Sequence, residues 1–221
     1  VRRTRTPCAD EAVHSHSKPH IMKTDSASLK KYRSNLRVWA KRATKEQWIS
    51  GMFWYSEAQS AAHTLADTYG VTPEVAAGVV SALSPNNKWE RNKLDAATVL
   101  AAVETGTPPE SVKVCTYNTN KIKAFDIAMG NRKVLKQSPK TFAFAQNVGN
   151  LDPNHVTIDK WHLRAMQTTA KDYKGAKTSV TPKQYRILEE ETVKVAREFG
   201  LSGYEFQAIV WVTIRDTWMN K

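Results

Sequence analysis

Two residues, Lys140 and Asp159, combine reactive side chains with positions that could favour chemistry. Lys140 stands at the predicted start of a helix, where the helix macrodipole disfavours a cation and so favours the neutral amine that a nucleophile needs. Asp159 follows residues 156–158 near another predicted helix start, where a carboxylate can cap the helix and also face a cleft. The lysine is therefore a candidate nucleophile and the aspartate a candidate catalytic carboxylate.

The elements that must position these two residues are predicted to be helices. From about Asp25 onward, apolar residues recur at helical spacing, and glycines such as Gly70 end the runs. Thr72-Pro73 and Thr181-Pro182 each combine a cap with a proline at the first helical position. No stretch shows sustained period-two alternation, so the sequence predicts an all-α fold. The predicted helices cover residues 30–45, 57–69, 73–83, 90–105, 119–129, 140–147, 158–169, 183–199 and 204–218.

The charge balance favours a polyanionic partner. The 221 residues include 33 Lys+Arg and 21 Asp+Glu, which leaves a formal net charge of +12. Such a field attracts nucleic acid. It could also hold a protein on an anionic membrane, but the sequence has no apolar run that would span a bilayer and no obvious basic amphipathic anchor. Double-stranded DNA is therefore the expected partner, with no membrane.

The two cysteines, Cys8 and Cys115, are too few for a disulfide framework, a four-cysteine zinc site or a cysteine-ligated iron–sulfur cluster. No metal or other cofactor is expected. Residues 1–21 lack the apolar core of a signal peptide. These observations predict a cytoplasmic monomer, either nucleoid-associated or in the cytoplasm of a host cell.

The first 24 residues are predicted to be a disordered basic tail, because they mix basic, proline and histidine residues without a period. His14, His16 and His20 could bind a metal, although histidines in such a tail are more often solvated. Met22 could be the initiator. Residues 25–221 are expected to form a single helical domain.

Five segments, in collinear order across roughly residues 57–216, resemble the endonuclease-III-like group of the helix-hairpin-helix DNA glycosylases. In that family a hairpin leads into Lys-Thr, and a Val-Asp-type segment follows about nineteen residues later. Lys140-Thr141 and residues 157–161 match that order and spacing. Residues 83–86 (LSPN) resemble the Leu-Ser-x-Gln loop, and residues 117–122 (YNTNKI) resemble the start of the helix before the hairpin. Residues 204–216 resemble the last family helix.

The chain also departs from the family pattern. Residues 135–139 (LKQSP) replace the usual glycine-rich hairpin, and Pro139 has no N–H to offer to a phosphate. The four cysteines of cluster-bearing members are missing, so the resemblance is to a clusterless, divergent branch. Lys160 and Trp161 stand after Asp159, where the family has a histidine.

The resemblance implies two helical subdomains with a cleft between them, one of them mainly residues 75–150 with a hairpin near 131–141. It implies base flipping, with Asp159 stabilising the positive charge that develops on the sugar. Lys140 would attack C1′ in an enzyme that also cleaves the strand. Asn86 would fill the vacated stack. The implied base-pocket residues are Trp89, Tyr117 and Trp161, and the implied DNA contacts are Asn86, Lys88, Arg91, Lys93, Lys121, Lys123, Lys136, Ser138 and Thr141.

Other interpretations of these residues stay open. Asp159 could be only a helix cap and Lys140 only a solvated lysine, while Trp89 and Trp161 could belong partly to the core. His155 and His162 are expected to be structural or solvent-facing. Three hypotheses follow: a DNA glycosylase with or without lyase activity, a glycosylase-derived enzyme that edits a modified base without excising it, and a non-catalytic DNA-binding module.

Overall fold

The computed structural model describes residues 21–170 and 173–219, and this part of the chain is helical without a named strand. One isolated bridge joins Ile21 to Ser179. The all-α prediction is confirmed. The helices are α1 (Ser26–Arg42), α2 (Lys45–Tyr69), α3 (Pro73–Leu83), α4 (Trp89–Glu104), η1 (Pro109–Ser111), α5 (Asn118–Ala128), η2 (Arg132–Gln137), α6 (Pro139–Val148), α7 (Lys160–Gln167), α8 (Pro182–Glu198) and α9 (Gly203–Met219).

The disordered tail was predicted to include residues 1–24, but its last four residues belong to the folded region. Met22 is 1% exposed, and its N–H donates to the Ser179 carbonyl over 3.3 Å. The folded region therefore already includes residues 21–24, because Met22 buries its side chain in the core. His14, His16 and His20, and the rest of residues 1–20, lie outside the described residues. No helix among the described ones is long and apolar enough to cross a membrane.

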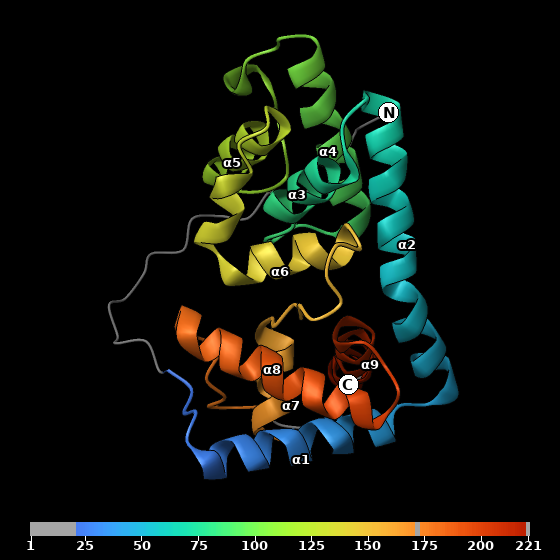
Figure 1. The fold of residues 1–221 in the computed structure, drawn as a ribbon, viewed down its shortest axis with the longest axis vertical. Coiled ribbons are helices and arrows are strands. Elements are labelled where there is room, and N and C mark those ends of the chain that lie inside the picture. Colours follow the sequence, from blue (N-terminus) through green and yellow to red (C-terminus); the bar gives the residue numbers. More distant parts are fainter. Residues whose placement is uncertain (1–20, 171–172, 220–221) are drawn as a thin grey trace, which may run out of the picture.

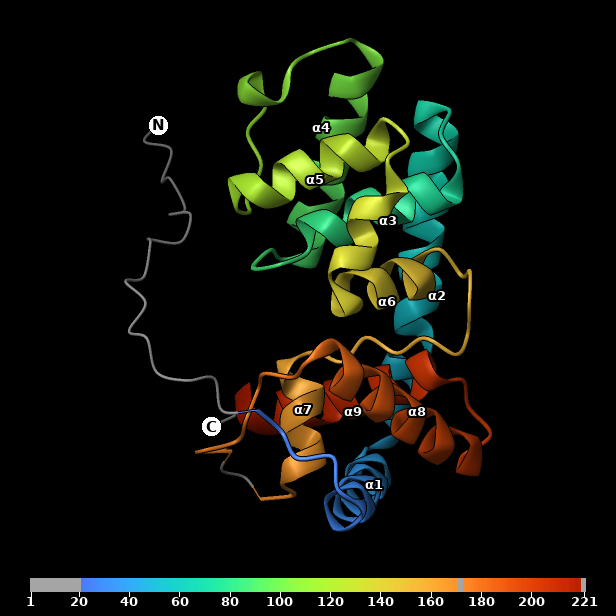
Figure 2. The same cartoon turned by 60° about the vertical axis from the view of Figure 1, so that its left-hand side comes forward.

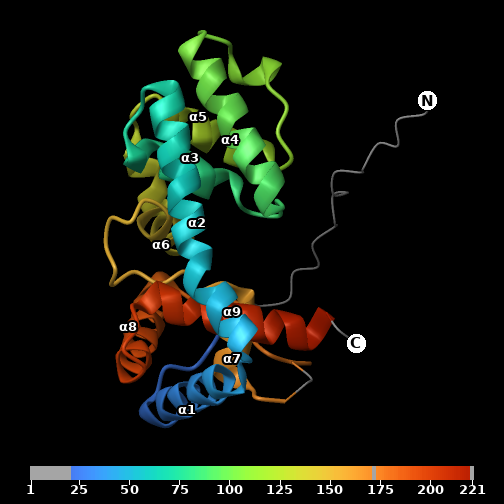
Figure 3. The same cartoon turned by 90° about the vertical axis from the view of Figure 1, so that its right-hand side faces the viewer.

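Buried residues form two hydrophobic clusters. One lies among α3, α4, α5, α6 and the second half of α2, around Val80, Leu83 and Phe125. The other lies among α1, α7, α8 and α9, around Trp39 and Phe206. Figure 1 shows the two groups of helices as an upper and a lower layer, with α2 running along both. Figures 2 and 3 show the same separation from two other sides.

Helix α2 is the long element that spans both layers, and a glycine lets it pack closely on α9. A Cβ placed on Gly51 would lie 2.5 Å from the Ile209 Cα, far inside van der Waals contact. Thr44 and Gln47 form a capping box at the start of α2, and Gly70 ends it at φ 59°. The long helix therefore has defined ends and a fixed crossing with α9.

A second connection joins the layers at residues 149–159, between α6 and α7 (Figure 2). This segment ends at Asp159. Before α6, the expected hairpin is a short 3-10 helix, η2, which leads through Ser138 into Pro139 at the first position of α6. Lys140 and Asp159 are thus positioned by the two helix starts on either side of this connection.

Candidate functional site

Asp159 caps α7 from an extended backbone conformation, φ −94° and ψ 180°. Its Oδ1 accepts a hydrogen bond from the His162 N–H at 2.8 Å. The residue as a whole is partly exposed. Burial raises its pKa above the ordinary value for aspartate, although the His162 N–H, the charge of Lys140 and the Trp161 N–H act in the opposite direction. The carboxylate is therefore both a helix cap and a desolvated group on a partly exposed residue.

The chain just before Asp159 is held by Tyr185 of α8. The Tyr185 hydroxyl accepts a hydrogen bond from the Ile158 N–H at 2.9 Å and donates to the Val156 carbonyl at 2.8 Å. Glu189, one turn further along α8, accepts from the Val156 N–H at 2.9 Å. These buried polar groups satisfy one another, as buried polar groups must. The backbone that presents Asp159 is thereby attached to α8.

The same segment is also attached to α6. Thr157 donates its hydroxyl to Asn147 Oδ1 at 2.9 Å, and Asn147 Nδ2 donates to the His155 carbonyl at 2.7 Å. Asn147 is fully buried. Its own carbonyl accepts from Gln59 of α2 at 3.0 Å. Helices α6 and α8 therefore hold residues 155–158, which have no regular secondary structure, and α2 in turn holds Asn147.

Lys140 approaches Asp159 from the first turn of α6. Its side chain is exposed, and its positive charge is among the influences that lower the Asp159 pKa. No direct hydrogen bond or ion pair joins the two side chains among the described contacts. The structure thus brings the two predicted residues into electrostatic range, but the Lys140 amine is not bonded to the Asp159 carboxylate.

An aromatic cluster lies where α2, α4, α6 and α9 meet. Trp54 is its centre, with ring centroids 5.5 Å from Trp89, 6.1 Å from Phe144 and 6.1 Å from Trp211. Phe144 stands one turn after Lys140 on α6. Trp89 thus belongs to an aromatic group that also includes Phe144, the residue one turn after Lys140 on α6. Trp54 and Trp211 were missed by the sequence reasoning.

Asn86 and Tyr117 meet at the corner between the α3–α4 loop and the start of α5. Asn86 Nδ2 donates to the Tyr117 hydroxyl at 2.7 Å, and both residues are exposed. Asn86 has a φ of 57°, a left-handed conformation that asparagine tolerates better than most residues. Asn86, which was predicted to fill the vacated stack, and Tyr117, which was predicted to line the base pocket, therefore form one exposed pair.

Several predicted DNA contacts have structural partners. Arg91 Nε lies 2.7 Å from Asp95 Oδ1, and Lys121 Nζ donates to the Val112 carbonyl at 2.9 Å. The Thr141 hydroxyl donates to Ser138 Oγ at 3.1 Å. Lys88 and Lys136 are exposed. Lys93 Nζ lies 2.8 Å from Glu90 Oε2. The predicted DNA contacts stay predictions.

Trp161 packs against other rings than Trp89 does. It stands edge-on to Tyr173 with centroids 5.8 Å apart, and the Arg164 guanidinium lies 4.7 Å from its centroid. Its partners come from α7 and the following segment, whereas Trp89 contacts α2. Among the described contacts, Trp89, Tyr117 and Trp161 therefore have different direct partners.

The two histidines near Asp159 have structural partners. His162 is fully buried, and its Nε2 lies 3.0 Å from Thr192 Oγ1. Burial lowers the pKa of His162 to about 3. His155 Nδ1 lies 3.0 Å from Glu189 Oε1. Among residues 21–170 and 173–219, no group of three or more metal-ligating side chains is close enough to bind an ion.

A hollow lies beside η2. It is lined by Arg132, Lys133 and Lys136, together with Phe142 and Leu151, and Asp159 does not line it. The surface next to η2 is therefore basic. Basic side chains supply this positive charge, whereas the hairpin of the glycosylase family offers the backbone amides of glycines.

A family model described as a family of unknown function, DUF7178, matches residues 18–218. The chain belongs to this family. The match covers both layers of helices, so Lys140, Asp159 and the aromatic cluster all lie within the DUF7178 region. No curated protein and no solved structure matches the chain.

Proposed function

We propose that this chain is a DNA N-glycosylase, which hydrolyses the bond between a damaged or modified base and its sugar after flipping the nucleotide out of the duplex. The observation that carries the proposal is the desolvated carboxylate of Asp159, a partly exposed residue within electrostatic range of Lys140. The order of five sequence segments, which resembles that of helix-hairpin-helix glycosylases, supports the same assignment.

Asp159 would act on the sugar. Breaking the N-glycosidic bond develops positive charge at C1′, and a fixed anion in a poorly solvated place stabilises that charge more than one in water. The same carboxylate could instead accept a proton from the attacking water. Both roles require the ionised form, which the Lys140 charge and the helix N–H groups favour.

Lys140 would add strand cleavage to base removal. Its neutral amine would form a bond to C1′ as the C1′–base bond breaks, and the departing base would take up a proton. Transfer of a proton from nitrogen to the ring oxygen, with cleavage of the C1′–O4′ bond, would give a Schiff base. Loss of a C2′ proton to a base would then expel the 3′ phosphate as the C3′–O bond breaks. The exposed position of Lys140 at the start of α6 leaves room for a nucleotide.

The fold suits a DNA substrate in two respects. The two hydrophobic clusters, connected by α2 and by residues 149–159, are compatible with the two subdomains of the glycosylase superfamily. The exposed Asn86–Tyr117 pair offers a polar tip that could enter the stack when a base leaves it. Double-stranded DNA bound by a monomer is the proposed complex.

The test is a panel of duplexes, each carrying one damaged or hypermodified base, incubated with the wild-type protein and with D159N. We expect base release and an abasic site on at least one duplex, and a borohydride-trapped adduct that K140A does not form if strand cleavage occurs. Mass spectrometry of the total bases separates excision from editing in place. Absence of released base on the whole panel would overturn the proposal.

A non-catalytic DNA-binding module is the second candidate, and η2 favours it. The short 3-10 helix with Lys136 takes the place of the glycine-rich phosphate hairpin, so binding there would depend on side-chain charge. A binder should keep or slightly raise its DNA affinity in D159N and show no turnover in either form. An enzyme should lose turnover while it keeps affinity.

A further inference from the structure

Three tryptophans from three different helices form one partly exposed aromatic group, which we call the tryptophan surface. Trp54 of α2 has its ring centroid 5.5 Å from that of Trp89 of α4 and 6.1 Å from that of Trp211 of α9. Each of the three residues is partly exposed, so the group is not sealed inside the core. Aromatic rings that solvent can reach are places where a nucleobase can stack.

The crossing of α2 and α9 brings this surface near Asp159 (Figure 3). Tyr55 follows Trp54 in the chain, and the two ring centroids lie 4.7 Å apart. The Tyr55 hydroxyl lies 3.2 Å from Gln207 Oε1 of α9. Burial raises the pKa of Tyr55, and the charge of Asp159 acts in the same direction, so the carboxylate is within electrostatic range of this phenol. The tryptophan surface therefore begins beside the candidate carboxylate.

An arginine lies at the other end of the surface. Gln207, Trp211 and Arg215 follow one another at intervals of four residues, so they share one face of α9. The Arg215 guanidinium lies 4.1 Å from the centroid of the Trp211 ring. Arg215 is about 12 Å from Gln207 along the helix axis. A ligand that extends from Asp159 along this face would therefore meet Gln207 first, then the indole and then the guanidinium.

The hydrogen-bonding capacity of Arg215 is only partly used. Its Nη2 lies 3.9 Å from Asp216 Oδ1, and the other oxygen of that carboxylate accepts from Gln47 Nε2 at 3.2 Å. The Arg215 Nε is buried and has no hydrogen-bond partner within residues 21–170 and 173–219. Because the side chain is 39% exposed, it can turn toward an incoming acceptor. Such a movement breaks no hydrogen bond of Nε and removes the cost of an unsatisfied donor.

We propose that the tryptophan surface holds the flipped base and that Arg215 selects a base with an oxygen acceptor, best a carboxylate, on the edge remote from the sugar. The inference rests on the proposed glycosylase function and names its substrate class. An arginine side chain has donors and no acceptor, and its planar fork fits a carboxylate through two hydrogen bonds. A methyl group in the same place would leave Arg215 without a new partner.

The test measures DNA binding in the D159N background, so that base release does not complicate the affinity. Two 25-base-pair duplexes carry either 5-carboxyuracil or thymine at one position, opposite an abasic position that makes flipping easier. The two bases differ only in the group on C5. R215M and R215K are compared with R197M, which removes an equal charge from an exposed position near the end of α8. Fluorescence anisotropy gives the affinities, and melting temperatures show that each variant is folded.

We expect the D159N protein to bind the 5-carboxyuracil duplex about tenfold more tightly than the thymine duplex, the effect of one charge-assisted hydrogen bond. R215M should lower this ratio to about one. R215K should keep part of it, because lysine keeps the charge but not the fork. R197M should keep the whole ratio, whatever it does to both affinities.

The stacking part of the inference has its own variants. W211L should weaken the binding of both duplexes about tenfold, because one stacking contact with the base is lost. W211F keeps an aromatic face and should bind like the D159N parent. W48L removes a partly exposed tryptophan of α2 outside the tryptophan surface and serves as the control. Equal losses in W211L and W48L would overturn the role of Trp211.

A ratio that R215M leaves unchanged would overturn the selection by Arg215, as would equal binding of the two duplexes by the D159N parent. These affinities do not depend on base release. An Arg215-dependent preference together with no released base in the wild type would therefore support the recognition site and overturn the glycosylase proposal. Base release from other duplexes, without that preference, would support the glycosylase proposal and overturn the present inference.

Discussion

The hydroxyl of Tyr185 lies 2.9 Å from the backbone nitrogen of Ile158 and accepts its hydrogen bond. The contact is buried, and it fixes the residue immediately before Asp159 to helix α8. The candidate carboxylate thus owes its position to a residue that follows it by 26 places in the chain. The phenol also donates to the Val156 carbonyl, so a single hydroxyl satisfies two backbone groups.

Removing that hydroxyl in Y185F should lower the free energy of unfolding by about 1–3 kcal/mol, because two buried backbone groups lose a partner. It should also lower kcat on a cleavable duplex more than it changes KM, since the Asp159 backbone would shift. Denaturant unfolding and steady-state kinetics measure the two effects. Y69F is the control, because no described hydrogen bond uses the Tyr69 hydroxyl. Equal effects in Y185F and Y69F would contradict the positioning role.

D159N should abolish base release and increase stability near neutral pH. Burial raises the pKa of Asp159 in the folded protein above its ordinary value of 3.8. The folded state therefore favours the protonated form, so the benefit is complete below pH 3.8, and the ionised group costs stability as pH rises through the folded pKa. Asparagine keeps the helix cap and removes that cost.

Unfolding experiments between pH 3 and 8 should therefore show a stability gain in D159N that grows with pH and vanishes below about pH 3.8. In the wild type, the rate of base release should fall on the acid side with a midpoint above that value. If D159N is less stable than the wild type at pH 7, Asp159 acts mainly as a cap.

K140M should move that acid midpoint upward, because the Lys140 charge lowers the Asp159 pKa and favours the ionised form. K136M removes an equal charge from an exposed position in η2 and serves as the control. A pH profile of single-turnover base release for the three proteins gives the midpoints. The interpretation fails if K136M and K140M shift the midpoint alike.

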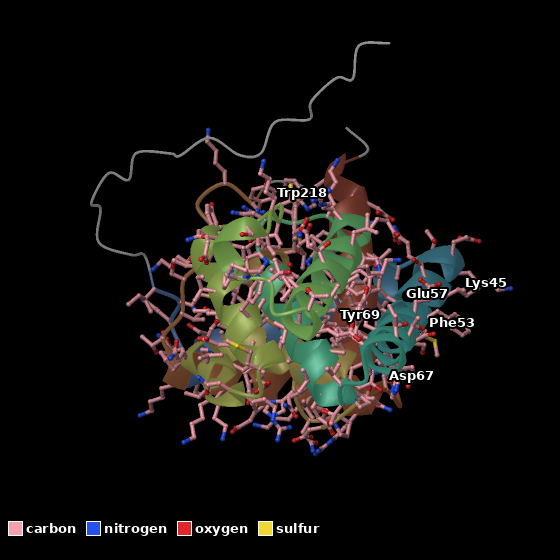
Figure 4. All side chains as sticks on the ribbon, turned by 90° about the horizontal axis from the view of Figure 1, so that it is seen from above. Lys45, Phe53, Glu57, Asp67, Tyr69 and Trp218 are labelled. Carbon is pink, nitrogen blue, oxygen red and sulfur yellow. The ribbon has the colours of Figure 1, made fainter. Side chains whose placement is uncertain are left out.

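Much of the fold could be read from caps and periodicity. The N-termini of α3 and α8 were predicted from Thr-Pro pairs. In both helices the threonine side chain caps the N-terminus and the proline is the first helical residue. The first half of α2 was missed, because Ile49, Met52 and Phe53 put apolar residues on its exposed side. Figure 4 shows Phe53 directed away from the body. The buried side carries Tyr55 and otherwise small residues, beginning with Gly51, whose role depends on Ile209 of a distant helix.

The candidate site was predictable only in part, for a related reason. Lys140 and Asp159 stand at helix starts, which local sequence reveals. The groups that hold Asp159 in place are buried polar side chains such as Asn147 and Glu189, which look like surface residues in a sequence. Trp54 and Trp211 meet across 157 positions, and no local period predicts that contact.

His162 should make the protein sensitive to acid. Its pKa is about 3 in the folded protein against an ordinary value of 6.5, because its buried side chain excludes the proton. A group with a lowered folded pKa of this kind gives its full stability above pH 6.5, and that stability is lost as pH falls toward 3. Near pH 5 the loss should approach about 1.4 kcal/mol per pH unit.

H162Q removes the titrating group and can still offer a polar atom to Thr192, the hydroxyl that now contacts the ring. We expect a lower stability at pH 7, because the packing of a fully buried ring is lost, and a shallower decline between pH 6.5 and 4. H63Q, at an exposed histidine of α2, should leave the wild-type decline unchanged. Denaturant midpoints measured at half-unit pH steps distinguish the slopes. Parallel curves for H162Q and the wild type would show that the acid sensitivity arises elsewhere.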